Sequence, residues 1–440
     1  MVRKQRRIRF AARWIDGQPG FAIRVVFRSG LTGPGQGTAS NRQPTTFSSD
    51  RDSLPVKFFM KRYLTRLYEA VINPPADSEL AKAWQLAESR LPTLWLLGKT
   101  GAGKSTVVQR MTGETAAEIG NGFMPCTSAA RAYDYPAEHP IARFMDTRGL
   151  GEVDYDPAED LASLGKSSQA LVIVIRLRDP EQSAVIDAVR KIRKSSAHLK
   201  TEHALVVFTG VLEIADERDR QRAIAGQQQL LTGAWGGAID YSAVDFPDTA
   251  RADASLQYGE ARLREMLAER LPEIALWLTV SGHGDAEKSN FDRLRPEVLW
   301  YAGAAAASDA VPLLGLVSVP AIQGKLLHSL ARKYGISWDR KTFYEFTAAL
   351  GSGFALSYAT SHGARQMVKL VPGYGQVAGA AFSVTVSYAV TYALGRAACM
   401  YLYHRKTGDP LDESGLREAY KHAVRDGRSA STDMRREHKP

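Results

Sequence analysis

The chain has 440 residues, of which 44% are hydrophobic and 24% are charged, and its formal net charge is +10. This length exceeds what one hydrophobic core usually supports, so we expect two or more globular domains. Two widely separated cysteines, Cys126 and Cys399, exclude a disulfide framework and a cysteine metal site, which fits a reducing cytoplasm.

The basic excess lies at the N-terminus. Residues 1–50 contain nine Lys/Arg and two Asp, a net charge of +7, and become rich in Gly, Ser, Thr and Pro. We expect a basic, disordered tail. Electrostatic contact with an anionic membrane surface or with nucleic acid is the alternative. The basic run has no interleaved aromatic residues for base stacking, so no specific nucleic-acid partner is indicated, and no apolar core of a signal peptide is visible.

Residues 51–92 form a predicted helical lead-in. Apolar residues at helical spacing predict one helix that runs to Val71 and a second over about 78–89. From residue 93 to 280 short β-rich runs alternate with helical patterns. The predicted strands are 141–145, 171–175 and 205–208, and the predicted helices are 181–194, 216–231 and 259–271. Residues 129–135 and 141–145 would form a hairpin at the sheet edge.

This alternation indicates an α/β fold with a mostly parallel sheet and helices on both faces. The stretch LWLLGKTGAGKS places a glycine-rich loop between an apolar strand and a helix. Gly98-x-x-x-x-Gly103-Lys104-Ser105 fits the P-loop pattern, in which backbone N–H groups surround an anion at a helix N-terminus. We therefore predict a P-loop NTPase fold, with nucleotide bound by Gly98, Lys99, Thr100, Gly101, Ala102, Gly103, Lys104, Ser105 and Thr106.

A second motif lies forty-one residues after Ser105. Asp146 ends a β-rich run and Gly149 follows three residues later. An Asp at this place can hold Mg²⁺, and a glycine N–H can contact a γ-phosphate closely. Thr127, in the loop between the two motifs, could add a hydroxyl group. The predicted Mg²⁺ ligands are therefore Ser105, Thr127 and Asp146, and the predicted catalytic residues are Lys104, Thr127 and Gly149.

These three elements, in this order, resemble the first motifs of the translation-factor-class GTPases, and of the Era-like group in particular. The stretch GKTGAGKS is also similar to septin and chloroplast-import-receptor GTPases. The resemblance covers about residues 93–272 and implies GTP as substrate, Mg²⁺ as cofactor, and two switch loops that carry Thr127 and Gly149.

Two positions depart from that resemblance. The Asn-Lys-x-Asp motif that reads guanine is missing, and Thr209-Gly-Val-Leu follows the corresponding strand. Thr209 and Asp245 are the candidate residues for contact with the base. Leu150 directly follows Gly149, where many relatives have a Gln that orients the attacking water. We therefore expect hydrolysis to be slow or to need an activator.

Beyond a polar linker at 281–296, residues 297–405 are rich in Ala, Gly, Leu and Val. They predict an all-α domain of two weakly repeated hairpins, because Val-Pro-x-x-Gly-x-Val at 311–317 recurs at 371–377. The pattern resembles the YcjF-type domain of unknown function, which follows a GTPase domain in many bacterial proteins. Residues 406–440 form a predicted polar C-terminal tail.

The helical domain leaves three alternatives open: a soluble bundle, membrane association, or a membrane span. Val377–Gly395 is nineteen residues without charge, near the length needed to span. It contains several Ser and Thr residues, and the mean hydropathy of the chain is −0.25. We expect a cytoplasmic protein, with peripheral attachment at the inner face of the cell membrane left open.

The sequence therefore predicts a GTP-binding protein that hydrolyses GTP slowly and acts as a nucleotide switch on its helical domain. The alternatives are a nucleotide-gated membrane-remodelling or structural module with weak turnover, and a P-loop ATPase. The expected partners are GTP and GDP, an unknown protein effector, and in the second case a membrane surface. No histidine pair has metal-ligand spacing, so Mg²⁺ is the one metal expected.

Overall fold

The computed structural model describes residues 65–113, 124–125, 130–147, 169–195, 200–246, 258–278, 285–311, 314–351, 354 and 378–437. All of them belong to one compact unit, residues 58–440. Predictions that concern Cys126, Thr127, Gly149, Leu150 and the tail 1–50 fall outside the described residues.

A seven-stranded sheet has the strand order β2-β3-β4-β1-β5-β6-β7. Its strands are β1 (Thr93–Leu97), β2 (Met124–Pro125), β3 (Ala130–Tyr135), β4 (Ala142–Thr147), β5 (Gln169–Arg176), β6 (Ala204–Thr209) and β7 (Tyr241–Ala243). The pairs β4-β1-β5-β6-β7 are parallel, whereas β2-β3 and β3-β4 are antiparallel. The mostly parallel α/β fold is therefore confirmed.

Strand β5 shows why the sheet is covered on both faces. Alternate side chains of a strand point to opposite faces. Leu171, Ile173 and Ile175 belong to one buried cluster, whereas Val172 and Val174 belong to a second. A strand that is buried on both faces needs a continuous apolar run, and the run ALVIVI supplies it.

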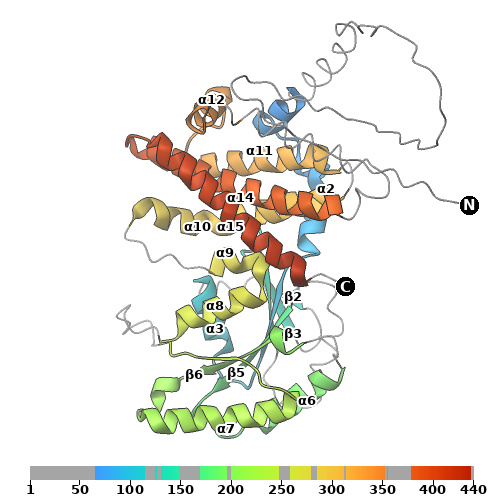
Figure 1. Cartoon of the computed structure of the whole chain (residues 1–440), viewed down its shortest axis with the longest axis vertical. Helices are drawn as coiled ribbons and strands as arrows, with labels where there is room; N and C mark the ends of the chain where they lie inside the picture. Colours follow the sequence, from blue (N-terminus) through green and yellow to red (C-terminus); the bar gives the residue numbers. More distant parts are fainter. Residues whose placement is uncertain are drawn as a thin grey trace, which may run out of the picture. The chain divides into compact units, whose positions relative to one another are not determined.

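Helices cover the two faces, as Figure 1 shows for the labelled elements. Helices α6 (Ser183–Ser195) and α7 (Glu217–Trp235) supply apolar residues to the first cluster. Helices α3 (Lys104–Thr112) and α8 (Glu260–Arg270) supply apolar residues to the second. This arrangement brings the carboxyl ends of β1, β5, β6 and β7 to one edge, where ligands bind in open α/β sheets.

The predicted edge hairpin is present. β3 pairs with β4 in antiparallel register, with Tyr135 opposite Ala142 and Arg131 opposite Asp146. The rings of Tyr133 and Phe144 stack 5.0 Å apart across the pair. Arg143 and Asp134 form a bidentate ion pair across these strands, with an Nε to Oδ1 distance of 2.6 Å.

The remaining regular elements of the described chain are helices. Residues 65–72 are helical. The other helices are α2 (Asp77–Glu88), α9 (Ala275–Leu278), α10 (Ala286–Asp309), α11 (Leu314–Tyr334), α12 (Arg340–Ala349), α14 (Ala378–Thr407) and α15 (Glu413–Glu437), with short 3-10 turns at η1 (Thr201–His203), η2 (Val211–Glu213) and η4 (Pro272–Ile274). Among the described residues after 285, no strand occurs.

Helix α10 differs from the sequence-based expectation. It begins at Ala286, so residues 286–296 of the predicted linker are helical. The Asp285 carboxylate caps the helix by accepting hydrogen bonds from the N–H groups of Glu287 and Lys288. Pro296 lies inside the helix and is buried. The domain limits at 280 and 297 remain predictions, as do the two repeated hairpins, because residues 371–377 are not among those described.

The second buried cluster continues from the sheet into the helices. It includes Leu94 of β1, Tyr135 of β3, Trp277 of α9 and Trp300 of α10. Its aromatic rings contact one another, with Tyr135 5.1 Å from Trp277 and Trp84 of α2 4.6 Å from Trp300. Within the described part of the chain, no helix is both long enough and apolar enough to cross a membrane.

Candidate functional site

The loop between β1 and α3 depends on its glycines. Gly101 and Gly103 adopt positive φ angles of 80° and 94°, which side chains other than glycine rarely allow. Gly98 is needed for another reason: an added Cβ would lie 2.4 Å from the carbonyl oxygen of Val174 on β5. Of the two glycines in the P-loop pattern, Gly103 is required by its backbone conformation and Gly98 by close packing.

Lys104 lies across this loop. Its side chain is buried, with 8% of its surface exposed. The ammonium group donates hydrogen bonds to the carbonyl oxygens of Gly98, at 3.0 Å, and Lys99, at 3.2 Å. A buried charge requires such partners. The loop therefore holds the ammonium group at the place where the pattern predicts phosphate.

Lys99 points elsewhere. Its ammonium group donates to the Asp179 carboxylate and to the Glu181 carbonyl oxygen, each at 2.7 Å. The hydrogen bond from Lys99 lowers the pKa of Asp179 from its ordinary value of 3.8. Lys99 therefore joins the loop to the segment after β5 through its side chain. Asp179 was not predicted from the sequence, because its only signal is its place just after a buried strand.

Thr209, at the end of β6, contacts the same loop. Its hydroxyl group donates to the carbonyl oxygen of Ala102 at 2.6 Å. Its side chain also packs against Gly103, where an added Cβ would meet it at 3.3 Å. Thr209 was predicted from the sequence as a contact for the base. In the structure its hydroxyl group is bonded to the phosphate loop, and contact with the base stays a prediction.

Asp245 follows β7 and lies beside the turn after β6. Its Oδ2 atom accepts a hydrogen bond from the N–H group of Leu212 at 2.8 Å. The Asp245 N–H group in turn donates to the carbonyl oxygen of Tyr258. The structure therefore brings Asp245 next to the segment 209–213, which the sequence analysis treated as a separate candidate.

The structure describes two of the three predicted metal ligands, Ser105 and the backbone of Asp146. Ser105 and Thr106 are exposed in the first turn of α3. The Asp146 backbone lies opposite Leu96 in the parallel register of β4 and β1. This register brings Asp146 to the edge at which the loop begins. Thr127 and Gly149 lie outside the described residues. Among the described residues, no cluster of three or more His, Cys, Asp or Glu side chains could hold a metal by itself.

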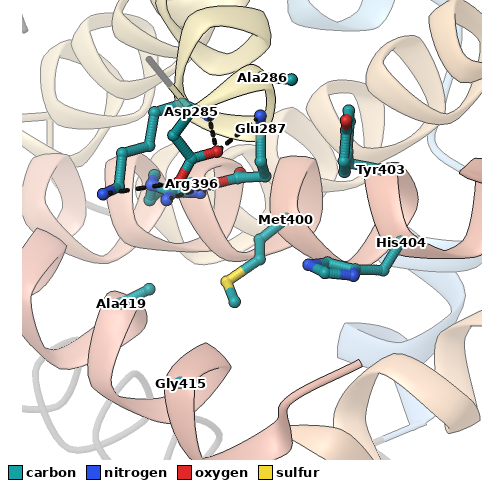
Figure 2. A pocket seen from close by; sticks show the side chains of 10 residues that line it. Asp285, Ala286, Glu287, Arg396, Met400, Tyr403, His404, Gly415 and Ala419 are labelled. Carbon is teal, nitrogen blue, oxygen red and sulfur yellow. Dashed lines mark hydrogen bonds and ion pairs between the residues drawn. The ribbon is translucent and has the colours of Figure 1, made fainter. Parts of the chain in front are cut away.

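A separate cavity of about 390 Å³ lies among the helices, lined by residues of α10, α14 and α15 and by Asp285. Figure 2 shows the Glu287 carboxylate against Arg396, with Met400 and His404 further along α14. Both oxygens of Glu287 accept from Arg396, at 2.6 and 2.9 Å. The charges that line this cavity are thus paired with each other, and it contains no glycine-rich loop.

The family model described as "50S ribosome-binding GTPase" matches residues 93–209. This range begins with β1 and ends at Thr209, so it contains the phosphate loop and Asp146. The chain therefore carries a P-loop GTPase domain, a type of domain that binds and hydrolyses GTP. The finer resemblances, to the Era-like group and to the YcjF-type domain, remain predictions.

Individual proteins resemble shorter parts of the chain. Magnetosome membrane protein 22 of Magnetospirillum gryphiswaldense is 26% identical over 137 residues, which is 30% of this chain and 69% of that protein. Toc33 from Arabidopsis thaliana is 17% identical at a TM-score of 0.28, covering 39% of this chain and 80% of its own. The LeoA bacterial dynamin GTPase from ETEC is 12% identical at a TM-score of 0.33, and the match covers 84% of this chain and 76% of LeoA. Because these TM-scores are low, the assignment of the GTPase domain rests on the family match alone.

Proposed function

We propose that this protein is a nucleotide switch that binds GTP with Mg²⁺, hydrolyses it slowly, and changes the packing of its helices when the γ-phosphate is lost. The observation that carries the proposal is the phosphate loop. Its backbone has the positive φ angles of a nest at Gly101 and Gly103, and Lys104 is already held across it.

Contacts with three other segments of the chain hold the phosphate loop. Gly98 packs on β5, and the Lys99 ammonium group donates a hydrogen bond to Asp179 after β5. The Ala102 carbonyl oxygen accepts a hydrogen bond from Thr209 of β6. On binding, the Lys104 ammonium group would exchange loop carbonyl oxygens for phosphate oxygens. Such preorganisation lowers the free energy that ordering the loop would otherwise take from binding.

The residues at this edge fit Mg²⁺. The ion prefers a few oxygen ligands and keeps the rest of its shell as water and phosphate oxygens. Ser105 is exposed in the first turn of α3, and the register of β4 ends at Asp146. These two residues and Thr127 would hold the ion. When bound, Mg²⁺ neutralises negative charge on the phosphate oxygens.

Hydrolysis is proposed to be slow, with Lys104, Thr127 and Gly149 as the catalytic residues. Lys104 would stabilise the charge that develops on the phosphate oxygens, and the Gly149 N–H group would contact the γ-phosphate. Leu150 has no group that can orient water. A protein activator that supplies such a group would therefore raise the rate.

The β3–β4 hairpin connects the proposed nucleotide site to the helices through direct contacts. The Tyr135 hydroxyl group donates to the carbonyl oxygen of Thr112, at the end of α3. The Tyr135 ring packs on Trp277 of α9, and His139 lies 4.4 Å from the Trp300 ring of α10. Because Asp146 lies near the end of β4 in the same hairpin, a movement at Asp146 would be transmitted to α9 and α10, where an unidentified protein effector could detect it.

The experiment is phosphate release from GTP by the full chain with Mg²⁺, with and without chelator, compared with a Lys104→Ala variant. The proposal expects slow release that both the chelator and the substitution abolish. Lys341→Ala is the matched control, because Lys341 lies on α12 with 78% of its side chain exposed. Release that Lys104→Ala leaves unchanged would contradict the proposal.

A second candidate is a nucleotide-gated membrane-remodelling module at the inner face of the cell membrane. Two observations favour it: the net charge of +7 over residues 1–50, and a relative whose printed name describes a magnetosome membrane protein. Co-sedimentation with vesicles that contain anionic lipid tests it. Binding that requires GTP supports this candidate, whereas no binding in any nucleotide state leaves the first.

A further inference from the structure

We propose that Asp245 reads the base of the bound nucleotide and selects guanine. The inference rests on the proposed function, since it concerns the same nucleotide. It identifies as specificity-determining a carboxylate that follows β7, although the sequence after β6 has no Asp at the expected place.

The position of Asp245 follows from the sheet. β1 carries the phosphate loop, and β5, β6 and β7 follow it in parallel order. A nucleotide whose phosphates lie at the end of β1 extends along the carboxyl edge, so its base reaches the turns after β6 and β7. Val244 is bonded through its N–H group to the carbonyl oxygen of Phe208, which fixes these two turns side by side.

Packing and hydrogen bonds hold the turn after β6. Gly210 has a φ of 62° and starts the short helix η2, in which Val211 is fully buried. The carboxylate of Glu213 receives two hydrogen bonds from Arg176, at 2.6 and 3.3 Å. Leu212 then points its N–H group at Oδ2 of Asp245, at 2.8 Å. The carboxylate is therefore held by a fixed donor.

The other polar groups at this corner are engaged. The Thr209 hydroxyl group is bonded to the phosphate loop, and both oxygens of Glu213 are bonded to Arg176. Among the described residues, the Asp245 carboxylate has one hydrogen bond, through Oδ2. Asp245 is partly exposed, and so is the neighbouring Leu212 side chain. The Oδ1 atom and the second lone pair of Oδ2 would accept hydrogen bonds from the base, beside the Arg176 guanidinium, which also attracts this carboxylate.

The chemistry of the base then decides the specificity. An ionised carboxylate only accepts hydrogen bonds and can accept two in parallel. Guanine presents two adjacent donors on one edge, its ring N1–H and its 2-amino group. Adenine has a ring nitrogen acceptor at N1 and no 2-amino group, so a carboxylate there would face a lone pair. Asp245 therefore favours guanine and rejects adenine.

The test measures binding of the diphosphates of guanosine, inosine, xanthosine and adenosine to the full chain with Mg²⁺. Inosine lacks the 2-amino group, and xanthosine has a carbonyl oxygen in its place. Asp245→Asn turns an acceptor into a donor that matches this oxygen. Asp219→Asn is the control, because Asp219 lies on α7 with 61% of its side chain exposed and pairs with Arg222.

We expect the unsubstituted chain to bind guanosine diphosphate at least about tenfold more tightly than inosine diphosphate. Asp245→Asn should weaken the binding of guanosine diphosphate and strengthen the binding of xanthosine diphosphate, each by about tenfold or more. Asp219→Asn should change neither affinity. Equal binding of guanosine and inosine diphosphates by the unsubstituted chain overturns the inference. So does an Asp245→Asn variant that keeps the original preference or loses both nucleotides together. If the unsubstituted chain binds no guanosine diphosphate at all, the proposed function itself fails.

Discussion

The hydroxyl group of Thr209 donates a 2.6 Å hydrogen bond to the carbonyl oxygen of Ala102, which lies 107 residues earlier in the chain. Both residues are buried. The end of β6 thus fixes the middle of the phosphate loop. A loop that is fixed in this way loses less conformational freedom when a ligand binds to it.

Thr209→Val keeps the shape of this side chain and removes its hydroxyl group. The Ala102 carbonyl then loses its hydrogen bond, so the free energy of unfolding should fall by about 1–3 kcal/mol, and GTP should bind more weakly because the loop is less ordered. Denaturant unfolding and nucleotide titration measure the two effects. Thr347→Val, which removes a hydroxyl group bonded within α12, should leave GTP affinity unchanged. Equal GTP affinity of Thr209→Val and the parent chain would show that the bond does not order the loop.

Gly98→Ala should unfold or strongly destabilise the nucleotide domain. The new methyl group would lie 2.4 Å from the Val174 carbonyl oxygen, on a central strand that cannot move aside. Overpacking of this kind costs about 1–3 kcal/mol or more. Gly226→Ala is the control, because nothing lies within 4 Å of the added carbon, inside α7, and it should stabilise the chain by up to about 1 kcal/mol. Thermal unfolding decides, and similar melting temperatures for the two variants would refute the argument.

His139 should make stability depend on pH. Burial against Trp300 lowers the pKa of His139 below its ordinary value of 6.5. The unfolded chain therefore binds a proton more readily than the folded chain, and stability falls as the pH drops below about 6.5 and on through the folded-state pKa. His139→Phe keeps an aromatic ring there and removes that loss. His328 has a lowered pKa too, but it is common to both proteins, so comparison of their unfolding free energies at pH 7.5 and 5 isolates His139. Identical pH dependence in both would assign the effect elsewhere.

The ion pair between Arg396 and Glu287 should contribute to the packing of α10 on α14. The side chains are only 15% and 11% exposed, so Arg396→Met leaves a largely buried carboxylate without its partner. Such losses cost about 3–5 kcal/mol. Adding Glu287→Gln to the same chain should recover part of the loss. Arg222→Met, which breaks a pair with exposures of 78% and 61%, should cost less than about 1 kcal/mol. Equal costs for the two single variants would contradict the predicted effect of burial.

The sequence predicted what depends on local pattern. The apolar run at 171–175 predicted β5, the edge hairpin followed from two β-rich runs around Pro136–Pro140, and the glycine spacing predicted the phosphate loop. Each of these signals lies within a few residues of the element that it predicts. The family match then supports the P-loop GTPase domain, and the role of each residue in the site remains a prediction.

The sequence did not predict contacts between distant segments. Nothing near Thr209 indicates that its partner is Ala102, and nothing near Lys99 indicates Asp179, because the sheet brings these residues together. The start of α10 at Ala286 was missed for a different reason. Polar residues at 281–296 suggested a linker, but the Asp285 cap and the burial of Phe291 stabilise a helix there.

We propose above all that the domain holds a guanine nucleotide through its phosphate loop. Calorimetric titration of the full chain with GTP and with ATP, each with Mg²⁺, tests this most directly when it is repeated on the Lys104→Ala variant. We predict that GTP binds at least about tenfold more tightly than ATP, and that the substitution abolishes this binding. Equal affinity for GTP and ATP, or GTP binding that survives Lys104→Ala, would contradict the account.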